Sequence, residues 1–424
     1  MKKKKFLGIA MTAALTLGSL AACSGGESKD EANGNKSGDG TTVTFWAPFS
    51  GPDGPRMKTI VEEYNKSQDE VNVDFQIVPQ SEYYKTVDLA MSGQKNTPDV
   101  MIMHGDQIPT YAEKNLLKDV TETAEKAEIT EDEYSETAWT GAQIDGKQYG
   151  IPLDIHPLVF YYNKDMFEAA GLDPENPPTN REEFLAAAKK MTDASKNQYG
   201  FVVPTLWPNQ FIFPTIVAQN GGELIEEGKV KYDSPEAVEA LAFLTDLITE
   251  EKVSPPNVQQ DGEVTLFLQG KNGMHLNGPW MMEQWEKAKI NYGVAPVPQL
   301  GTEKQAVYGN SHNFVIPAAV EDEKTLEATT DFLKYVADNS MEWAKSGMAP
   351  TSKAVYESPE FQEMKQQPQV AKQFEYTVFS PQISNWGQVS EPLWQEVNLA
   401  LLGKKDPKQA MEDAAKKAEQ LLNK

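Results

Sequence analysis

Four tryptophans stand beside turn-forming residues, where a loop rather than a helix would present the side chain. They are Trp46, Trp207, Trp280 and Trp386, each within two positions of a proline or glycine. An indole offers a flat apolar face and one N–H donor. A pyranose ring also has an apolar C–H face, and carboxylates or amides can bind its hydroxyls. The pattern predicts stacking on sugar rings, with core packing as the alternative for each tryptophan taken singly.

The other four tryptophans lie in segments of helical character, where we expect core packing. They are Trp139, Trp285, Trp343 and Trp394. Two tyrosine pairs could bind ferric iron, but tyrosines inside strands and helices more often pack in the core. These pairs are Tyr83-Tyr84 and Tyr161-Tyr162.

The chain lacks the short motifs of common catalytic and phosphate-binding sites. It contains no G-x-x-x-x-G-K-[ST], no G-x-G-x-x-G and no G-x-S-x-G. Its four histidines, His104, His156, His275 and His312, are not spaced as a zinc-binding pair on a helix. Paired carboxylates could perform glycosidase chemistry, but such pairs arise by chance among 63 acidic residues. We therefore expect a protein that is not an enzyme, with no cofactor and no metal.

The rest of the chain must position these side chains. Its hydrophobic patterns alternate between those typical of strands and those typical of helices. Strand patterns at 42–46, 71–77 and 99–103 are separated by helical patterns at 56–67 and 83–92, the order of a parallel sheet covered by helices. A second such region begins at residue 158. Helix starts are expected at a Thr179–Glu182 capping box and at Ser234-Pro235, and a final helix at 407–422. Two α/β lobes follow, with the ligand at the carboxyl ends of strands.

The composition of the chain disfavours several classes of binding partner and bound group. The 424 residues carry a net charge of −24, which disfavours nucleic acid and anionic lipid because both require a basic surface. A single cysteine excludes a disulfide framework and any site built from several thiolates.

Residues 1–22 have the pattern of a signal peptide. Lysines at 2–5 precede an apolar run at 6–20, which is shorter than the ~20 residues that span a bilayer. Leu20-Ala21-Ala22-Cys23 resembles the lipobox of bacterial lipoproteins, which predicts acylation of Cys23. The alternative is an ordinary secretory signal with an incidental cysteine. Residues 23–40 are rich in Gly, Ser, Asn and charged residues, which indicates a flexible tether.

Several segments spread through the chain together resemble the family 1 extracellular solute-binding proteins of ABC importers, the group that includes the maltodextrin-binding proteins. They are Pro98–Val100 leading to Asp106, Gly150–Pro152 leading to Tyr161–Phe167, Pro177–Phe184, Gln219–Gly222, Asn277–Trp280 and Asn291–Pro298. The resemblance implies an α/β, periplasmic-binding-protein-like fold of two discontinuous lobes joined by a hinge, with the ligand in the cleft between them. Lobe one would comprise 41–155 and 302–337, and lobe two 158–300 and 338–424. The hinge crossings would lie near 155–158 and 300–302.

The same resemblance implies a set of ligand-binding residues. Trp46 matches an aromatic residue at the end of the first strand, and Asp106 matches a carboxylate that accepts paired sugar hydroxyls. Trp280 matches a stacking tryptophan that follows Gly-Pro. Phe211 falls near a cleft aromatic, and Trp386 lies in the region where another stacking tryptophan is expected.

Four further positions complete the expected site. His156 stands where the maltodextrin-binding proteins have an acid near the hinge, so neighbouring Asp154 is the candidate to supply that charge. Asn310 and His312 lie at the entry to the returning strand of lobe one and are candidate ligand contacts. Turn residues that bond only to backbone are the equally favoured alternative for these two.

Together these features predict a lipid-anchored receptor for a neutral mono- or oligosaccharide, on the extracellular face of a Gram-positive-type membrane. We expect a monomer that closes about its hinge and delivers sugar to a membrane permease. A secreted glycoside hydrolase, with two carboxyls about 5–9.5 Å apart, and a lipoprotein adhesin are the alternatives. A receptor for a peptide or a metal would need an ion partner or a ligand cluster, which the sequence does not reveal.

Overall fold

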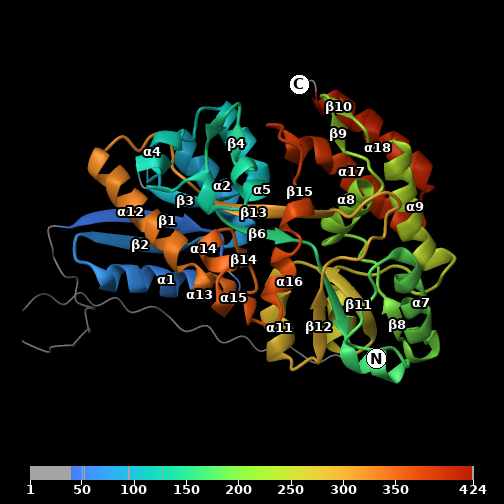
Figure 1. The fold of residues 1–424 in the computed structure, drawn as a ribbon. Helices are drawn as coiled ribbons and strands as arrows, with labels where there is room; N and C mark the ends of the chain where they lie inside the picture. The colour runs from blue at the N-terminus through green and yellow to red at the C-terminus, as the bar shows by residue number, and fades with distance from the viewer. Residues whose placement is uncertain (1–39, 50, 52, 94–95, 127, 423–424) are drawn as a thin grey trace, which may run out of the picture. The chain divides into compact units, whose positions relative to one another are not determined.

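The computed structural model describes residues 40–422 apart from positions 50, 52, 94–95 and 127 (Figure 1). The predicted signal peptide at 1–22, the predicted lipidation site Cys23 and all but the last residue of the predicted tether lie outside the described residues. In the part of the chain that is described, no helix combines the length and the apolar character needed to cross a membrane.

The first sheet begins with the βαβαβ order that the sequence predicts. Its elements are β1 (Thr41–Ala47), α1 (Asp53–Ser67), β2 (Val71–Ile77), α2 (Gln80–Gly93) and β3 (Val100–His104). β1 pairs in parallel with β2 and with β3. The sheet then continues with antiparallel strands in the order β3-β13-β6-β14. These added strands are β6 (Ile151–Pro157), β13 (Val307–Val315) and β14 (Ala349–Pro350).

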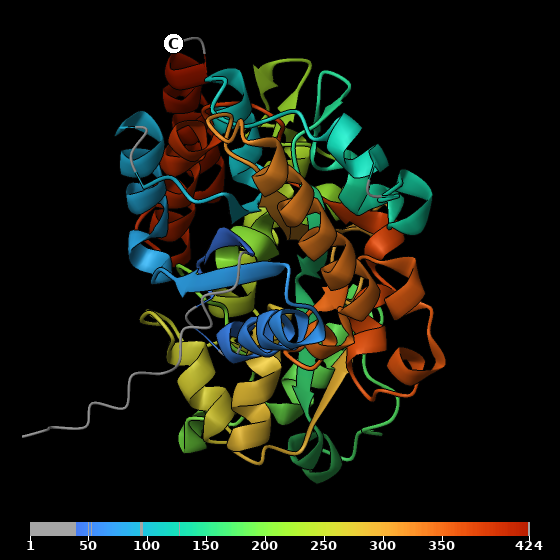
Figure 2. The ribbon, with the colours of Figure 1, turned by 90° about the vertical axis from the view of Figure 1, so that its left-hand side faces the viewer.

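Alternation along β1 determines which helices cover each face of this sheet. Phe45 and its alternate neighbours are buried on one face, where α1 and α12 (Glu323–Asn339) lie side by side (Figures 1 and 2). The ring of Phe45 lies 5.7 Å from that of Phe332 on α12. Tyr83 of α2 covers the opposite face, and its hydroxyl donates to the carbonyl of Ile102 at 2.6 Å.

The second sheet has the strand order β12-β7-β11-β8. Its strands are β7 (Val159–Asn163), β8 (Tyr199–Phe201), β11 (Asn272–Asn277) and β12 (Tyr292–Ala295). β8 and β11 are parallel, but β7 runs antiparallel to both β11 and β12. The prediction of a second purely parallel region is therefore wrong, because β7 enters directly from β6 and that crossing sets its direction.

We call the parts of the chain around the first and second sheets lobe one and lobe two. Leu158, which is buried, separates β6 from β7, and its N–H donates to the carbonyl of Tyr308 at 2.9 Å. α7 (Arg181–Met191), α8 (Asn209–Gln219), α9 (Pro235–Thr249), α17 (Trp386–Leu401) and α18 (Pro407–Leu422) contribute to the core of lobe two.

One segment departs from the lobe boundaries that the family resemblance implied. β14 pairs with β6, and Trp343 of α13 (Met341–Ala344) packs in the core of lobe one. Residues 341–350 therefore lie with lobe one rather than lobe two. The reason is that β6 would otherwise leave an edge unpaired, which β14 covers.

Capping residues explain where the longer helices begin. Ser234 caps α9 as predicted. The box expected at Thr179 and Glu182 is displaced by one residue, because Asn180 adopts the extended backbone of the N-cap. Glu183, rather than Glu182, accepts from the N–H of Thr179 at 2.9 Å.

Shorter elements connect these parts. They are α3 (Ile108–Glu113), α4 (Thr121–Lys126), α5 (Glu136–Thr140), β4 (Gln143–Ile144), β5 (Lys147–Gln148), α6 (Lys164–Ala169), β9 (Ile225–Glu226), β10 (Lys229–Val230), α10 (Gly262–Leu268), α11 (Met282–Lys287), α14 (Lys353–Tyr356), α15 (Pro359–Gln362), α16 (Gln367–Ala371) and β15 (Thr377–Val378).

Candidate functional site

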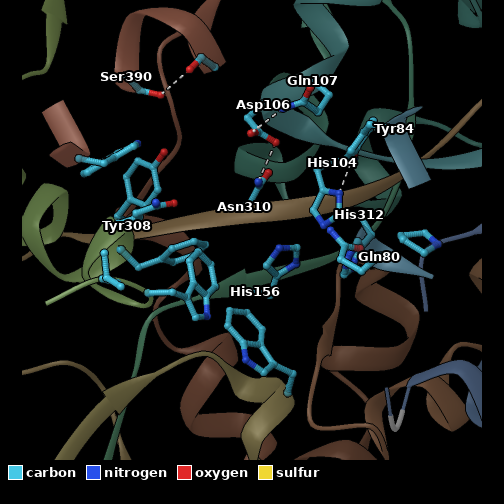
Figure 3. Close-up of a pocket in the computed structure, with 18 of the residues that line it drawn as sticks. Gln80, Tyr84, His104, Asp106, Gln107, His156, Tyr308, Asn310, His312 and Ser390 are labelled. Carbon is cyan, nitrogen blue, oxygen red and sulfur yellow. Dashed lines mark hydrogen bonds between the residues drawn. The ribbon is translucent and has the colours of Figure 1, made fainter. Parts of the chain in front are cut away.

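A cavity of about 1150 Å³ lies between the two lobes (Figure 3). Lobe one lines it from β3, β6 and β13, and lobe two lines it from α8, from the turn after β11 and from α17. The carboxyl ends of β3 and β11 both reach this cavity, which is where α/β folds place their ligands.

An aromatic wall formed by Trp207, Phe211, Trp280 and Tyr308 lines one side of the cavity. The rings of Trp207 and Trp280 are stacked, with centroids 5.9 Å apart and planes at 24°. Phe211 meets these two rings edge-on at 5.2 and 6.0 Å. Trp207 remains 36% exposed, so part of an indole is open to a ligand with an apolar face.

The local sequence explains the position of Trp280. It lies in a 3-10 turn, Pro279–Met281, directly after β11. A Cβ on Gly278 would lie 2.0 Å from the indole ring, so a glycine is needed where the ring crosses the backbone. The carbonyl of Gly278 accepts from the hydroxyl of Tyr161 on β7 at 2.8 Å, which holds the turn against the sheet.

Asp106 presents a carboxylate at the end of β3, in the 3-10 turn Gly105–Gln107. The side-chain amide of Asn310 on β13 donates to Oδ1 at 2.9 Å, and that of Gln107 donates to Oδ2 at 3.0 Å (Figure 3). A carboxylate has about four acceptor positions, so Asp106 keeps capacity for ligand hydroxyls. Its two amide partners fix its orientation.

Three histidines from neighbouring strands meet on the lobe-one side of the cavity, and we call them the histidine cluster (Figure 3). His104 ends β3, His156 lies on β6, and His312 lies on β13 directly opposite His104. Ring centroids are 4.3 Å apart for His156 and His312, and 4.8 Å apart for His104 and His312. His156 also meets the ring of Trp280 edge-on at 5.9 Å, so the cluster adjoins the aromatic wall.

Asp154 lies behind the histidine cluster and is fully buried. It accepts from Nδ1 of His156 at 2.9 Å, from Nδ1 of His312 at 2.8 Å and from Nε1 of Trp343 at 2.8 Å. Burial by itself would raise the pKa of Asp154, but the charge and hydrogen bonds of the two histidines lower the pKa well below its usual value. Burial and the neighbouring His312 lower the pKa of His104 and of His156.

The lysine, arginine, aspartate and glutamate content of the cavity lining favours negative charge. Asp53, Asp106 and Glu391 line it, whereas no lysine or arginine is found among the described residues of its lining. Among its described residues, the lining therefore offers no lysine or arginine to pair with a phosphate or carboxylate of a ligand.

Most of the residues that the sequence suggested lie around this cavity. The lining includes Asp106, His156, Phe211, Trp280, Asn310, His312 and Trp386, together with Trp207. Asp154 lies behind the lining and orients two histidines instead of facing a ligand.

Trp46, like Asp154, does not appear among the residues that line the cavity. Its Nε1–H donates to Gln76 on β2 at 3.2 Å. β2 is the outer strand of the sheet, and Trp46 also packs against the hydrophobic cluster that includes Tyr83 of α2 and Met101 of β3. The expectation that Trp46 stacks on the ligand is not supported by this position.

The four tryptophans expected in the core differ in their surroundings. Trp139, Trp285 and Trp343 are buried as predicted, whereas Trp394 is half-buried: it packs against the core of lobe two, as predicted, and also lines the cavity. The sequence reading also missed His104, Tyr84 and Tyr308 in the lining. His104 could have been found, because it ends an apolar strand pattern two residues before Asp106.

Comparison with known proteins gives consistent relatives over nearly the whole chain. Residues 59–371 match the sequence profile of a family described as bacterial extracellular solute-binding protein. The galactooligosaccharide-binding protein of Bacillus subtilis is 25% identical over 431 residues, covering 99% of this chain and 97% of that protein. A maltooligosaccharide ABC transporter solute-binding lipoprotein of Streptococcus pneumoniae is 29% identical over 75% of each chain.

Solved structures agree on the fold. An ABC transporter solute-binding protein from Thermotoga lettingae, bound with α-D-tagatose, has a TM-score of 0.76 and 26% identity, covering 90% of this chain and 100% of that one. The match to the family profile extends over most of the residues of both lobes. The chain therefore belongs to the bacterial extracellular solute-binding proteins, which bind solutes rather than transform them, and it has their mixed α/β periplasmic binding protein fold.

Proposed function

We propose that this chain is the sugar-binding component of an ABC importer and that its cleft binds a neutral oligosaccharide. Family membership assigns extracellular solute binding, and the chemistry of the cleft supports the sugar. The proposal rests on the make-up of the cavity: an aromatic wall faces carboxylate and amide groups. Among the described residues of the lining there is no lysine or arginine. A saccharide has the matching combination of apolar ring faces and uncharged hydroxyls.

The size of the cavity favours more than one sugar ring. At about 1150 Å³ it is larger than the sites of most drug-sized ligands, which occupy about 300–1,000 Å³. Relatives named for galactooligosaccharides and maltooligosaccharides agree with this size. A monosaccharide would leave much of the aromatic wall uncovered.

Stacking and hydrogen bonding both contribute to the free energy of sugar binding. A micromolar dissociation constant corresponds to about −8 kcal/mol. Stacking on two indoles contributes about 1 kcal/mol each beyond burial, and each hydrogen bond to a carboxylate contributes about 1.5–3 kcal/mol. Trp280, Trp207 and Asp106 can therefore supply part of this free energy, and burial of the apolar ring faces adds to it.

We further propose that sugar binding favours a closed arrangement of the two lobes. Asp106 and Asn310 belong to lobe one, whereas Phe211 and Trp280 belong to lobe two. A ligand that contacts both sets stabilises the conformer in which both are within reach. The closed complex would then dock on the membrane permease and release the sugar into it.

Acylation of Cys23 would attach the protein to the outer face of the membrane. The proposal rests on the lipobox-like Leu20-Ala21-Ala22-Cys23 and on a relative named as a lipoprotein. Acyl chains supply membrane affinity that a net charge of −24 opposes. Labelling with a fatty acid analogue tests it: label should appear on the wild type and be absent from Cys23→Ala.

Calorimetric titration against a panel of neutral mono- and oligosaccharides tests the sugar assignment. We expect at least one oligosaccharide to bind without turnover and to stabilise the protein by about 2.7 kcal/mol at 100 times its dissociation constant. Release of shorter sugars would indicate a glycoside hydrolase instead. Absence of binding and of thermal stabilisation across the panel would favour an adhesin and refute the proposal.

A further inference from the structure

The histidine cluster has a geometry that sugar binding does not require. One nitrogen of each ring lies within 4.8 Å of a nitrogen on both other rings. A sugar hydroxyl needs a single donor or acceptor at each contact, which an amide such as that of Asn310 supplies. Among the described residues, no other three His, Cys, Asp or Glu side chains come close enough to share an ion.

Buried partners hold the three rings through the same nitrogen. Nδ1 of His156 and of His312 donates to Asp154, so Nε2 is the nitrogen of each ring that remains to bind an ion. Nδ1 of His104 lies 2.6 Å from the hydroxyl of Tyr84, so the third ring is also held at Nδ1 (Figure 3). A carboxylate behind a metal-binding histidine is the common arrangement in metal sites, since it orients the ring and raises its basicity.

We propose that His104, His156 and His312 bind a divalent transition-metal ion of the zinc class through Nε2, at the floor of the cleft. Three imidazoles and one coordination position open to the cavity form the usual pattern of an open zinc site. Nitrogen ligands favour Zn²⁺, Cu²⁺, Ni²⁺ or Co²⁺ over Mg²⁺ and Ca²⁺, which require oxygen ligands. The proposal is independent of whether the cleft also binds a sugar.

Metal binding must draw the rings together. Bonds of about 2.0–2.1 Å in a tetrahedral site place the ligand nitrogens about 3.3 Å apart, whereas here one nitrogen of each ring lies within 4.8 Å of a nitrogen on the other two rings. His104 is the least buried of the three rings, since His156 and His312 are 3% and 6% exposed. We therefore expect His104 to make most of the movement.

The electrostatics of the cavity favour a cation. Asp53, Asp106 and Glu391 line it without a described lysine or arginine, which raises the local concentration of positive ions. The buried carboxylate of Asp154 partly balances the charge of an ion held by the three imidazoles. Because the cavity is far larger than an ion, the metal would occupy its floor and leave the aromatic wall free.

Titration with metal alone tests the proposal. Tag-free protein is treated with EDTA, dialysed and titrated with Zn²⁺ in a calorimeter, and with Co²⁺ while its visible absorption is recorded. We expect one ion per chain and the absorption of tetrahedral, nitrogen-coordinated Co²⁺. His104→Gln should weaken Zn²⁺ binding by at least about a hundredfold, the upper end of the loss seen for orienting residues, and should abolish the Co²⁺ absorption.

Two further variants complete the design. His275→Gln removes the fourth histidine, which is buried outside the cluster, and should keep wild-type metal affinity. His104→Ala provides a second substitution at the most accessible ring, and thermal melting verifies that each variant is folded. The proposal is overturned if the wild type gives neither Zn²⁺ heat nor Co²⁺ absorption. It is equally overturned if both His104 variants bind the ions as the wild type does.

Discussion

Trp280 and Trp46 are both tryptophans near the end of a strand, yet their surroundings differ. Trp280 follows β11 and stacks on Trp207 in the cavity, 5.9 Å between centroids. The indole N–H of Trp46 instead donates to Gln76 on β2, the outer strand of the first sheet. The two tryptophans therefore form a natural pair of test and control for sugar stacking.

Trp280→Ala should weaken binding of the saccharide found by titration by about tenfold to a hundredfold, because the main stacking surface is lost. Trp46→Ala should leave the affinity unchanged. Calorimetric titration of both variants measures the difference. If Trp280→Ala kept wild-type affinity, or Trp46→Ala lost it, the aromatic wall would not be the sugar site.

Asp106→Asn should reduce sugar affinity by about tenfold to a hundredfold, because a charged acceptor becomes a neutral one. The melting temperature without ligand should change little, since the residue lies on a turn. Asp165→Asn is the control, because Asp165 also accepts from an asparagine, Asn291 at 2.7 Å, but lies outside the cavity. A large loss of unliganded stability in Asp106→Asn would instead mark the residue as structural.

At the scale of elements, three strands of one sheet assemble the polar half of the cavity. β13 lies between β3 and β6, and its register sets His312 opposite both His104 and Asp154. The register shifts between His312 and Asn313, which marks an irregularity of the pairing with β6 at the site itself. Strand pairing thus determines which polar side chains meet.

Helices α17 and α18 are joined through a buried carboxylate, and its loss should destabilise lobe two. Glu396 is 2% exposed and accepts from Lys405 and from Lys417, each at 2.6 Å. Glu396→Gln should lower the free energy of unfolding by about 2 kcal/mol, measured by urea denaturation. Glu412→Gln, which breaks only the exposed pair with Lys408 at 3.9 Å, should stay within about 0.5 kcal/mol. Equal effects of the two variants would contradict this account.

Glu263 at the start of α10 should make stability fall as pH rises. It is 1% exposed, neither carboxylate oxygen has a partner among the described residues, and burial raises the pKa to about 7. Below the unfolded pKa of about 4.5, Glu263 is protonated in both the folded and the unfolded state, so its burial carries no ionisation cost. Above pH 7 the group is ionised in both states, and burying its charge lowers the free energy of unfolding by about 3 kcal/mol.

Removing this ionisable group should therefore stabilise the protein at high pH only. Glu263→Gln should match the wild type near pH 4.5 and exceed its free energy of unfolding by up to about 3 kcal/mol at pH 8. Denaturant titrations at several pH values measure the difference, with exposed Glu168→Gln as the control. A difference independent of pH would show that packing, not ionisation, is responsible.

At the scale of the whole molecule, both the net charge of −24 and the cavity oppose anionic ligands. A neutral oligosaccharide should therefore bind at least about a hundredfold more tightly than the same sugar carrying a phosphate, which would meet Asp106 and Glu391 unpaired. Competition calorimetry at two salt concentrations measures the ratio, which salt should reduce because it screens repulsion. Comparable affinity for the two ligands would contradict a neutral cargo.

Much of this organisation could be predicted from the sequence because it depends on local patterns. Periodicity predicted the βαβαβ order at 41–104, and capping predicted the start of α9 at Ser234. Aromatic residues beside turns pointed to Trp207, Trp280 and Trp386 in the cavity. The helical pattern predicted that Trp394 packs against the core, but it could not show that the same residue also lines the cavity.

The sequence alone determined the classes of chemistry present: indoles at turns, an excess of acids, and few histidines. Only the tertiary structure decided which of these groups share one cavity. Asp154 and His312 are 158 positions apart in the chain and meet through the pairing of β6 with β13. Trp46 donates to Gln76 on the neighbouring strand β2 and does not line the cavity. The physical reason is that strand pairing joins distant segments and sets the register and direction of each side chain, and neither is encoded in the pattern of a single strand.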